Sequence, residues 1–162
     1  MRILVINPGS TSTKIAVFED ESPILVRTIV HSADELAHFD DVIEQQDFRK
    51  QLVLDELRQA DIPVEFDAVI GRGGLVKPLE GGVYEINDLM IQDTHSGIAL
   101  HNHACNLGCL IAHEIAQNIP HCRSFIADPG AHPSILILAY TSGHILTYSS
   151  SDASPSIGPL LS

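Results

Sequence analysis

Two short apolar segments separated by a polar turn open the chain and define its first structural unit. Residues 3–6 (ILVI) and 15–18 (IAVF) are apolar and largely β-branched, and residues 7–14 between them read NPGSTSTK. Apolar segments that flank a run of turn-forming residues predict a β-hairpin, here with a broad polar turn. Residues 24–30 (ILVRTIV) predict a third strand. We therefore expect the chain to start with three strands.

Helices and strands are expected to alternate after these three strands. Ser32 and Glu35 have the spacing of a capping box, which predicts the start of a short helix, and Asn87 is expected to cap a later one. Apolar residues at helical spacing predict longer helices over about residues 41–60 and 102–119. Further strands are expected at residues 66–71, 84–86 and 124–127. This order predicts an α/β domain in which helices cover a mixed sheet.

Composition limits the partners of the chain. With 162 residues and 44% hydrophobic side chains, the chain is long enough to bury a core in one domain. Its 21 Asp and Glu residues outnumber its 9 Lys and Arg residues, and the formal net charge of -12 repels nucleic acid and anionic membranes. We therefore expect small-molecule partners, with no nucleic acid and no membrane.

Cysteine and histidine spacing predicts neither disulfides nor a metal site. The three cysteines form no CxxC pair, which fits free thiols in a reducing compartment. The histidines near them show HxHxC and CxxxC spacing, which lacks the paired knuckles of structural zinc sites. The apolar start is broken by a turn too early for a signal sequence or membrane span, so a cytoplasmic location is expected. The cysteines and histidines of this region are Cys105, Cys109, Cys122, His95, His101, His103, His113 and His121.

The polar turn has the chemistry of a phosphate site. Backbone N–H groups of a tight turn can hold an anion, the hydroxyls of residues 10–13 can donate hydrogen bonds, and Lys14 supplies a compact positive charge. An exposed hairpin turn without a ligand explains the same residue types. A Walker loop is excluded, because GxxxxGK[ST] is absent and the turn leads into a strand where that motif requires a helix.

Three segments resemble one enzyme family. The opening ILVINPGSTSTKIAVF is similar to the first phosphate motif of acetate and butyrate kinases, which belong to the actin-like ATPase superfamily. Residues 68–87 (AVIGRGGLVKPLEGGVYEIN) resemble the butyrate kinase loop after the central strand. Residues 103–116 (HACNLGCLIAHEIA) resemble the family's SNLG element, with Cys105 where serine is usual. The resemblance covers residues 1–129 and implies a ribonuclease H-like domain, with the family's second domain missing.

The resemblance implies a nucleotide site in the first motif. The family residues that line its phosphate and magnesium region fall on Asn7, Ser10, Ser12 and Lys14 of this chain, beside the backbone-permissive Gly9. It therefore implies ATP and Mg²⁺ as cofactors, with Asn7 as a candidate magnesium ligand.

Two further residues are implied to act on the reacting groups. Arg72 matches the family's substrate arginine, whose planar fork can hold a carboxylate or phosphoryl oxygens. A surface salt bridge is its alternative role. Asp128 matches the family's active-site acidic residue, which acts on the metal-nucleotide complex or positions the acyl acceptor. A lone Asp at a strand end is also a common helix cap.

The implied reaction moves the γ-phosphoryl group of ATP to a short-chain carboxylate, so that butanoate and ATP give butanoyl phosphate and ADP. A carboxylate is ionised at neutral pH and needs no general base, so alignment and charge neutralisation suffice. The resemblance also implies that intact members are homo-oligomers. Half of a two-domain cleft should bind ATP poorly, so we expect little turnover from this chain.

The composition changes at residue 130. Residues 130–162 contain no Lys, Arg or Glu, one Asp and eight Ser. Residues 135–140 could form a strand, and the rest is typical of loop or disorder. We expect a domain over residues 1–129 followed by a low-charge tail, and we hypothesise a frameshift or gene disruption. A downstream DNA sequence that encodes no second phosphate loop in any frame would refute the frameshift.

Other functions remain open from the sequence alone. Acetate kinase and branched-chain acyl kinase share the first motif, and one sequence does not assign the residues that would size the acyl pocket. A non-catalytic interaction fragment or remnant is a different class of answer, which purification would separate by showing either a cooperative soluble protein or aggregation. A sugar kinase of the same superfamily is disfavoured, because the loop after the central strand follows the acyl kinase pattern.

Overall fold

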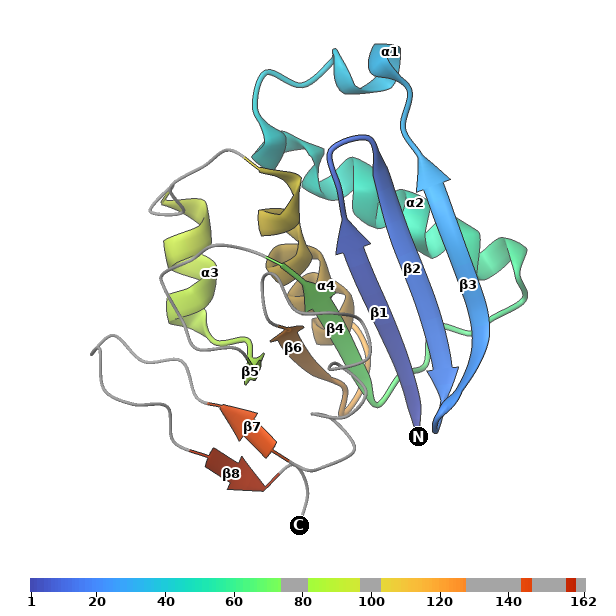
Figure 1. The fold of residues 1–162 in the computed structure, drawn as a ribbon, viewed down its shortest axis with the longest axis vertical. Helices are drawn as coiled ribbons and strands as arrows, with labels where there is room; N and C mark the ends of the chain where they lie inside the picture. Colours follow the sequence, from blue (N-terminus) through green and yellow to red (C-terminus); the bar gives the residue numbers. More distant parts are fainter. Residues whose placement is uncertain (74–81, 97–102, 128–143, 147–156, 160–162) are drawn as a thin grey trace.

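The strands of the chain form one mixed sheet (Figure 1). The computed structural model describes residues 1–73, 82–96, 103–127, 144–146 and 157–159. Its strands are β1 (Arg2–Pro8), β2 (Ser12–Glu19), β3 (Ser22–Val30), β4 (Ala68–Arg72), β5 (Val83–Glu85), β6 (Arg123–Ala127), β7 (His144–Leu146) and β8 (Ile157–Pro159). Its helices are α1 (Ala33–Leu36), α2 (Gln46–Gln59), α3 (Asp88–His95) and α4 (Leu107–Gln117), with 3-10 turns η1 (Val42–Gln45) and η2 (Ala104–Asn106).

The sheet combines a hairpin meander with parallel strands. In the order β3-β2-β1-β4-β6-β5-β7-β8, β1, β2 and β3 are antiparallel neighbours, whereas β1 pairs with β4 and β4 with β6 in parallel. The predicted α/β class and mixed sheet are confirmed. The strand considered at residues 135–140 lies outside the described residues.

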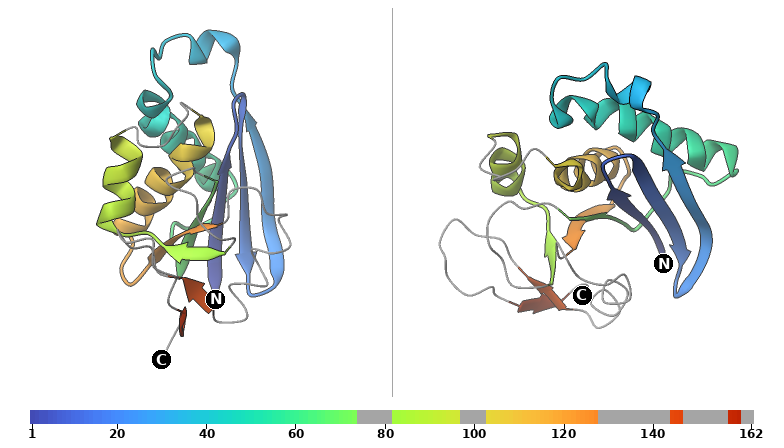
Figure 2. Two further views of the ribbon diagram at one scale, coloured as in Figure 1. Left: turned by 60° about the vertical axis from the view of Figure 1, so that its left-hand side comes forward. Right: turned by 45° about the horizontal axis from the view of Figure 1, so that its top comes forward.

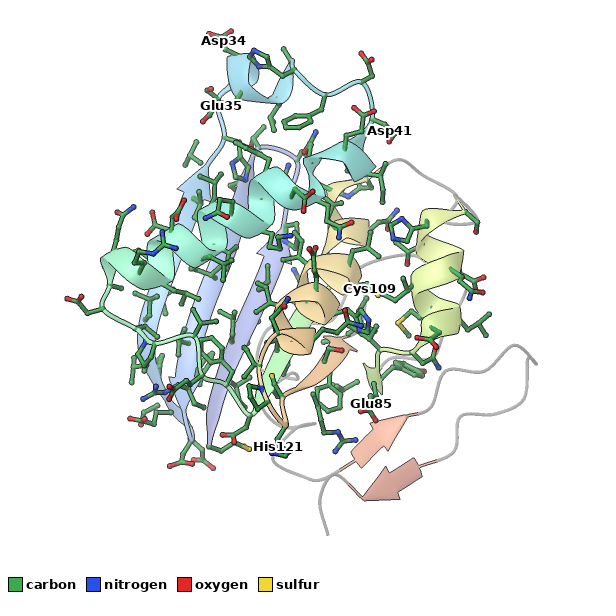
Figure 3. All side chains as sticks on the ribbon, turned by 180° about the vertical axis from the view of Figure 1, so that it is seen from behind. Asp34, Glu35, Asp41, Glu85, Cys109 and His121 are labelled. Atoms are coloured by element: carbon green, nitrogen blue, oxygen red, sulfur yellow. The ribbon has the colours of Figure 1, made fainter. Side chains whose placement is uncertain are left out.

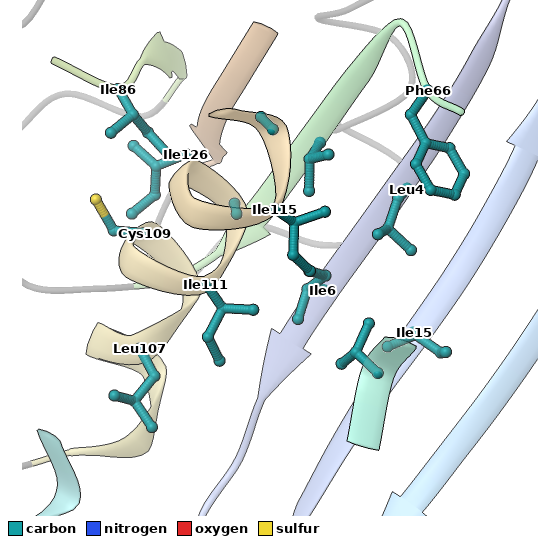
Figure 4. Close-up of a cluster of buried hydrophobic side chains, with 14 of the residues drawn as sticks. Leu4, Ile6, Ile15, Phe66, Ile86, Leu107, Cys109, Ile111, Ile115 and Ile126 are labelled. Atoms are coloured by element: carbon teal, nitrogen blue, oxygen red, sulfur yellow. The ribbon is translucent and has the colours of Figure 1, made fainter. Parts of the chain in front are cut away.

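Helices α2 and α4 cover one face of this sheet (Figure 2). Alternate residues of the strands, such as Leu4, Ile6 and Ile15, point toward these helices, because successive side chains of a strand face opposite sides. They pack with Leu107 and Ile111 of α4 (Figure 4). A second buried cluster lies on the opposite face and consists of Ile3, Ala68, Ile70, Val83, Phe125 and Ala127.

The predicted caps are confirmed. The Glu35 N–H donates to Ser32 Oγ at 3.2 Å, and the Ser32 N–H donates to the Glu35 carboxylate at 2.7 Å. The Met90 N–H donates to Asn87 Oδ1 at 3.0 Å, which starts α3. Each cap satisfies backbone N–H groups that have no partner inside the helix.

Two sequence predictions need correction. The broad turn expected over residues 7–14 is narrower, because β1 continues to Pro8 and β2 resumes at Ser12. The helices expected over residues 41–60 and 102–119 each begin with a 3-10 turn, η1 and η2. Capping contacts explain these starts: Asp41 caps η1 and His103 caps η2.

Two glycines let α4 lie directly on β4. A Cβ atom on Gly71 of β4 would lie 2.1 Å from the carbonyl oxygen of Gly108 in α4. A Cβ atom on Gly108 would lie 2.8 Å from the Arg72 carbonyl oxygen. The backbones of α4 and β4 are therefore in direct contact at the end of β4, and this contact fixes the position of Arg72.

Two further findings concern the cysteines and the helices. All three cysteines are free thiols, as expected. Among the helices of the described residues, none has the length and apolar character needed to cross a membrane.

Candidate phosphate site

The carboxyl ends of parallel strands bring the predicted residues to one edge of the sheet. Ile6 of β1 pairs with Gly71 of β4, so the next residues along these strands are Asn7 and Arg72. On the other side of β4, Arg72 pairs with Ala127, the last residue of β6. Sequence separations of more than 50 residues are thus closed by sheet register alone. Asp128, the residue after β6, lies outside the described residues.

Strand alternation places these side chains on the sheet face opposite α2 and α4. Ile6 packs toward the helices, so Asn7 points to the other face. Lys14 lies directly opposite Asn7 in the β1–β2 ladder, and Ser12 shares its face two residues earlier. Arg72 lies two residues after Ile70, a member of the cluster on that same face. The register therefore gathers an amide, a hydroxyl and two cations.

The turn between β1 and β2 is tight. The Gly9 N–H donates to the Ser12 carbonyl oxygen at 2.7 Å, and Pro8 pairs with Thr13. Ser10 is exposed at the tip, Lys14 is also exposed, and Ser12 is partly exposed. Within the ranges that the structure describes, the Lys14 ammonium makes no hydrogen bond or ion pair. An available cation on a protein of strongly negative net charge fits an anionic ligand.

A buried arginine lies beneath this turn, and sequence reasoning missed it. Arg49 of α2 has 0% exposure. Its Nη1 donates to the Gly9 carbonyl oxygen at 2.8 Å and to Thr13 Oγ1 at 3.1 Å, and its Nη2 donates to the Ser10 carbonyl oxygen at 3.2 Å. The sequence did carry a signal, because Arg49 precedes Val53 and Leu57 at intervals of four and shares their buried stripe. The apolar residues that predict this helix include Phe48 and Leu52, which are only partly buried, beside the buried Leu57.

His31 joins the same buried network from the end of β3. Its Nε2 and Thr13 Oγ1 lie 2.9 Å apart, and its backbone N–H donates to the Thr11 carbonyl oxygen at 2.9 Å. Burial lowers the pKa of His31 below its usual value, and the positive charge of Arg49 lowers it further, against a smaller opposing effect of Glu35. Burial and this charge therefore favour the neutral form of the imidazole under the turn.

Backbone geometry after Arg72 is specific to glycine. Gly73 has a φ of 85°, in the left-handed region, and a Cβ atom there would lie 2.8 Å from Cys105 Cβ. Cys105 thus lies against Gly73, directly after β4, with its Sγ 3.1 Å from His103 Nδ1. The second and third family-like segments meet at this point. Cys109 lies deeper, between α4 and α3 (Figure 3).

The residues of this face fit phosphate oxygens with a weakly held divalent cation. Mg²⁺ usually keeps several waters and binds through one or two protein oxygens plus substrate phosphates. The side-chain amide of Asn7 offers an oxygen of this kind on the same face. The described residues contain no group of three or more His, Cys, Asp or Glu side chains that could hold a metal by themselves.

The fold is shared with a solved structure of a known kinase. The chain is similar in structure to acetate kinase from Entamoeba histolytica, with a TM-score of 0.50 and 15% identity over 78% of this chain and 34% of that protein. This likeness concerns the fold alone, and it confirms the predicted fold class, an actin-like ATPase fold with a mixed sheet and flanking helices.

Sequence comparison then identifies the relatives. The chain is 59% identical over 143 residues to a probable butyrate kinase of Bacteroides thetaiotaomicron, which is 88% of this chain and 40% of that protein. It is 57% identical over 129 residues to a probable butyrate kinase of Phocaeicola vulgatus, which is 80% of this chain and 36% of that protein. No family model matches the chain. The chain is therefore related to the butyrate kinases, as the sequence motifs predicted, and spans about 40% of the length of these relatives.

The longer match also bears on the composition change at residue 130. A match of 143 residues exceeds the 129 residues of the expected domain, so part of it falls within residues 130–162. The boundary at residue 130 and the origin of the tail stay predictions.

Proposed function

We propose that this chain carries the phosphate-handling part of a butyrate kinase-type phosphotransferase, in which the γ-phosphoryl group of ATP passes to a short-chain carboxylate. The observation that supports this most strongly is the gathering of Asn7, Ser12, Lys14 and Arg72 on one sheet face at the ends of β1 and β4. A structural hairpin turn alone gives no reason for two cations to lie there.

The two cations of this face suit different groups of the substrates. Lys14 offers a compact charge with three rotatable donors beside the turn, which suits a phosphate oxygen. Arg72 offers a planar fork at the end of β4, which suits two oxygens of a carboxylate or of the transferring phosphoryl group. ATP would supply the phosphoryl group and Mg²⁺ would neutralise part of its charge, with Asn7 as one ligand. The acceptor carboxylate is already ionised, so this site needs no histidine base.

Asp128 completes the proposed set from the next strand. It follows Ala127 directly in sequence, and Ala127 pairs with Arg72. We assign it to the metal-nucleotide complex or to the acyl acceptor. The nucleotide base and sugar have no assigned residues in residues 1–129, so this domain by itself should bind ATP weakly and leave the transferring phosphate in contact with water. We also propose that the protein is located in the cytoplasm and that intact members of the family form homo-oligomers.

A chimeric enzyme tests the proposed reaction. Residues 1–129 of this chain replace the matching segment of the Bacteroides thetaiotaomicron relative, and acyl phosphate is trapped as the hydroxamate with butyrate, ATP and Mg²⁺. We expect activity with the chimera and little or none with the 162-residue chain alone. In the chimera, Lys14→Met and Arg72→Gln should each lower kcat/KM by about a hundredfold or more, whereas Arg58→Gln, on an exposed side chain, should not.

Two outcomes of this assay would contradict the proposal. A folded but inactive chimera beside an active parent would show that residues 1–129 do not supply a working phosphate site. Turnover by the 162-residue chain at the rate of the parent would show that the rest of the relatives' length is not needed. Comparison of acetate, butyrate and isobutyrate in the active chimera would separate the three acyl kinase alternatives.

A further inference from the structure

Arg49 is buried without a charged partner among its described contacts. Its five acceptors are uncharged: the carbonyl oxygens of Gly9, Ser10 and Ser12, the Thr13 hydroxyl and the Gln45 side-chain amide. A buried guanidinium costs free energy unless its donors are satisfied. Three of the five acceptors are backbone carbonyl oxygens of one turn. Packing of α2 on the sheet does not require an arginine that binds this turn.

The direction of these hydrogen bonds sets the direction of the turn's N–H groups. The carbonyl groups of Gly9 and Ser10 point toward Arg49. A trans peptide unit directs its C=O and its N–H in opposite directions, and the described residues contain no cis peptide. The N–H groups of Ser10 and Thr11 therefore point away from Arg49. In the described part of the chain neither N–H makes a backbone hydrogen bond.

Gln45 and His31 support this arrangement. The Gln45 side-chain oxygen accepts hydrogen bonds from Arg49 Nε and Nη2 at 3.0 and 2.8 Å, and these bonds fix the guanidinium plane. His31 holds the Thr11 carbonyl oxygen through its own N–H. Consecutive carbonyl groups are thus bound from within the protein, and the N–H groups of Ser10 and Thr11 are left for a ligand.

We propose that Arg49 is a positioning residue that holds the β1–β2 turn so that the Ser10 and Thr11 N–H groups receive a phosphate oxygen. The inference rests on the proposed function, since it names the device that shapes the same site. Arg49 itself does not touch the phosphate, because it lies on the helix side of the turn. Oriented N–H groups of this kind form an anion site that needs no reorganisation when the ligand arrives.

Pyrophosphate with Mg²⁺ is a suitable probe for the 162-residue chain, because it needs no adenosine site. Arg49→Lys keeps the charge but cannot reach Gln45 and the turn carbonyl groups together. We expect it to raise the Kd for pyrophosphate at least tenfold and to speed hydrogen exchange of the Gly9 N–H at least tenfold. Amides of Val69 and Ile111 in the core should exchange as before.

The matched control is Arg58→Lys on the same helix, where the side chain is 73% exposed, and it should change neither quantity. Should Arg49→Lys fail to fold, Thr13→Val removes a single acceptor of Arg49 and is expected to weaken pyrophosphate binding at least threefold. An unchanged Kd in the folded variant would overturn the role of Arg49 and leave the proposed function standing. No pyrophosphate binding by the unaltered chain would instead overturn the proposed function, and the inference with it.

Discussion

Replacing Gly71 with alanine should be among the most damaging single-methyl changes in the described fold. The added Cβ would lie 2.1 Å from the Gly108 carbonyl oxygen and 2.4 Å from its carbonyl carbon, and both are backbone atoms of α4. Neither side can yield easily, because Gly71 pairs with Ile6 on one side and Ile126 on the other. Overpacking a core costs about 1–3 kcal/mol, and a contact between two backbones belongs at the upper end, about 3 kcal/mol.

Urea unfolding measures this loss. With a slope of about 2 kcal/mol per molar urea, a loss of about 3 kcal/mol lowers the midpoint by roughly 1.5 M. Two matched variants set a scale. Gly9→Ala should change stability little, since its Cβ meets nothing closer than 3.3 Å. Gly108→Ala should lie between, because its contact with the Arg72 carbonyl oxygen is at 2.8 Å and alanine favours a helix by about 1 kcal/mol.

The order of stability of the three variants tests this packing. The close approach of α4 to β4 predicts that the loss of stability falls from Gly71→Ala to Gly108→Ala to Gly9→Ala. A Gly71→Ala protein as stable as the Gly9→Ala protein would show that α4 does not lie directly on β4. The placement of Arg72 at the end of β4 would then lose its structural basis.

Three smaller predictions concern a cap, a buried histidine and the thiols. Asn87→Ala should cost about 1 kcal/mol in urea unfolding, because the Met90 N–H loses its acceptor. The folded pKa of His31 lies below its usual 6.5, so the unfolded chain binds a proton that the folded chain refuses. Stability should therefore be full above pH 6.5 and fall as the pH decreases below it, and His31→Gln should flatten that slope in unfolding measured at several pH values. Burial raises the pKa of the Cys109 thiol to about 12 and that of the Cys122 thiol to about 11, so at pH 8 a thiol reagent should react fast with one cysteine only, and Cys105→Ser should remove that fast phase.

Local sequence signals predicted several elements of the fold. Alternation, capping chemistry and helical spacing act over a few residues, and they predicted the strands around the polar turn, the Ser32 and Asn87 caps and the helix that contains α4. The narrowing of the turn could not be read this way. Asn7 has the side chain of a turn residue and Lys14 ends the polar run, but ladder pairing across the hairpin keeps both in the strands.

The missed features of the site depend on contacts between distant segments. Arg49 is separated from the turn by about 40 residues of sequence, and its charge predicts a solvent-exposed position on α2. Three of the acceptors that allow its burial are backbone carbonyl groups of the turn, which every sequence possesses. The Gly71 and Gly108 contact is similar, because a glycine in a strand or helix reveals a close approach without naming the partner.

The residues assigned to catalysis came from family resemblance, and the register explains why the resemblance works. The motifs containing Lys14 and Arg72 are far apart in sequence, yet β1 lies between β2 and β4 and brings both to one face. Asp128 has the right place in sequence to join them, and its role stays a prediction.

Chemical-shift mapping of pyrophosphate and Mg²⁺ on the isotope-labelled 162-residue chain tests the central claim most directly. We predict that the backbone amides of residues 9–13 and the Nε–H of Arg72 shift together and saturate at one concentration, since they line one site. A separate groove is lined by Lys50 and Arg58 of α2 and by Glu114 of α4. Amides along this groove should stay unchanged, although it also contains cations. Shifts confined to that groove, or a turn and an Arg72 that respond at different concentrations, would contradict a single phosphate site on this face of the sheet.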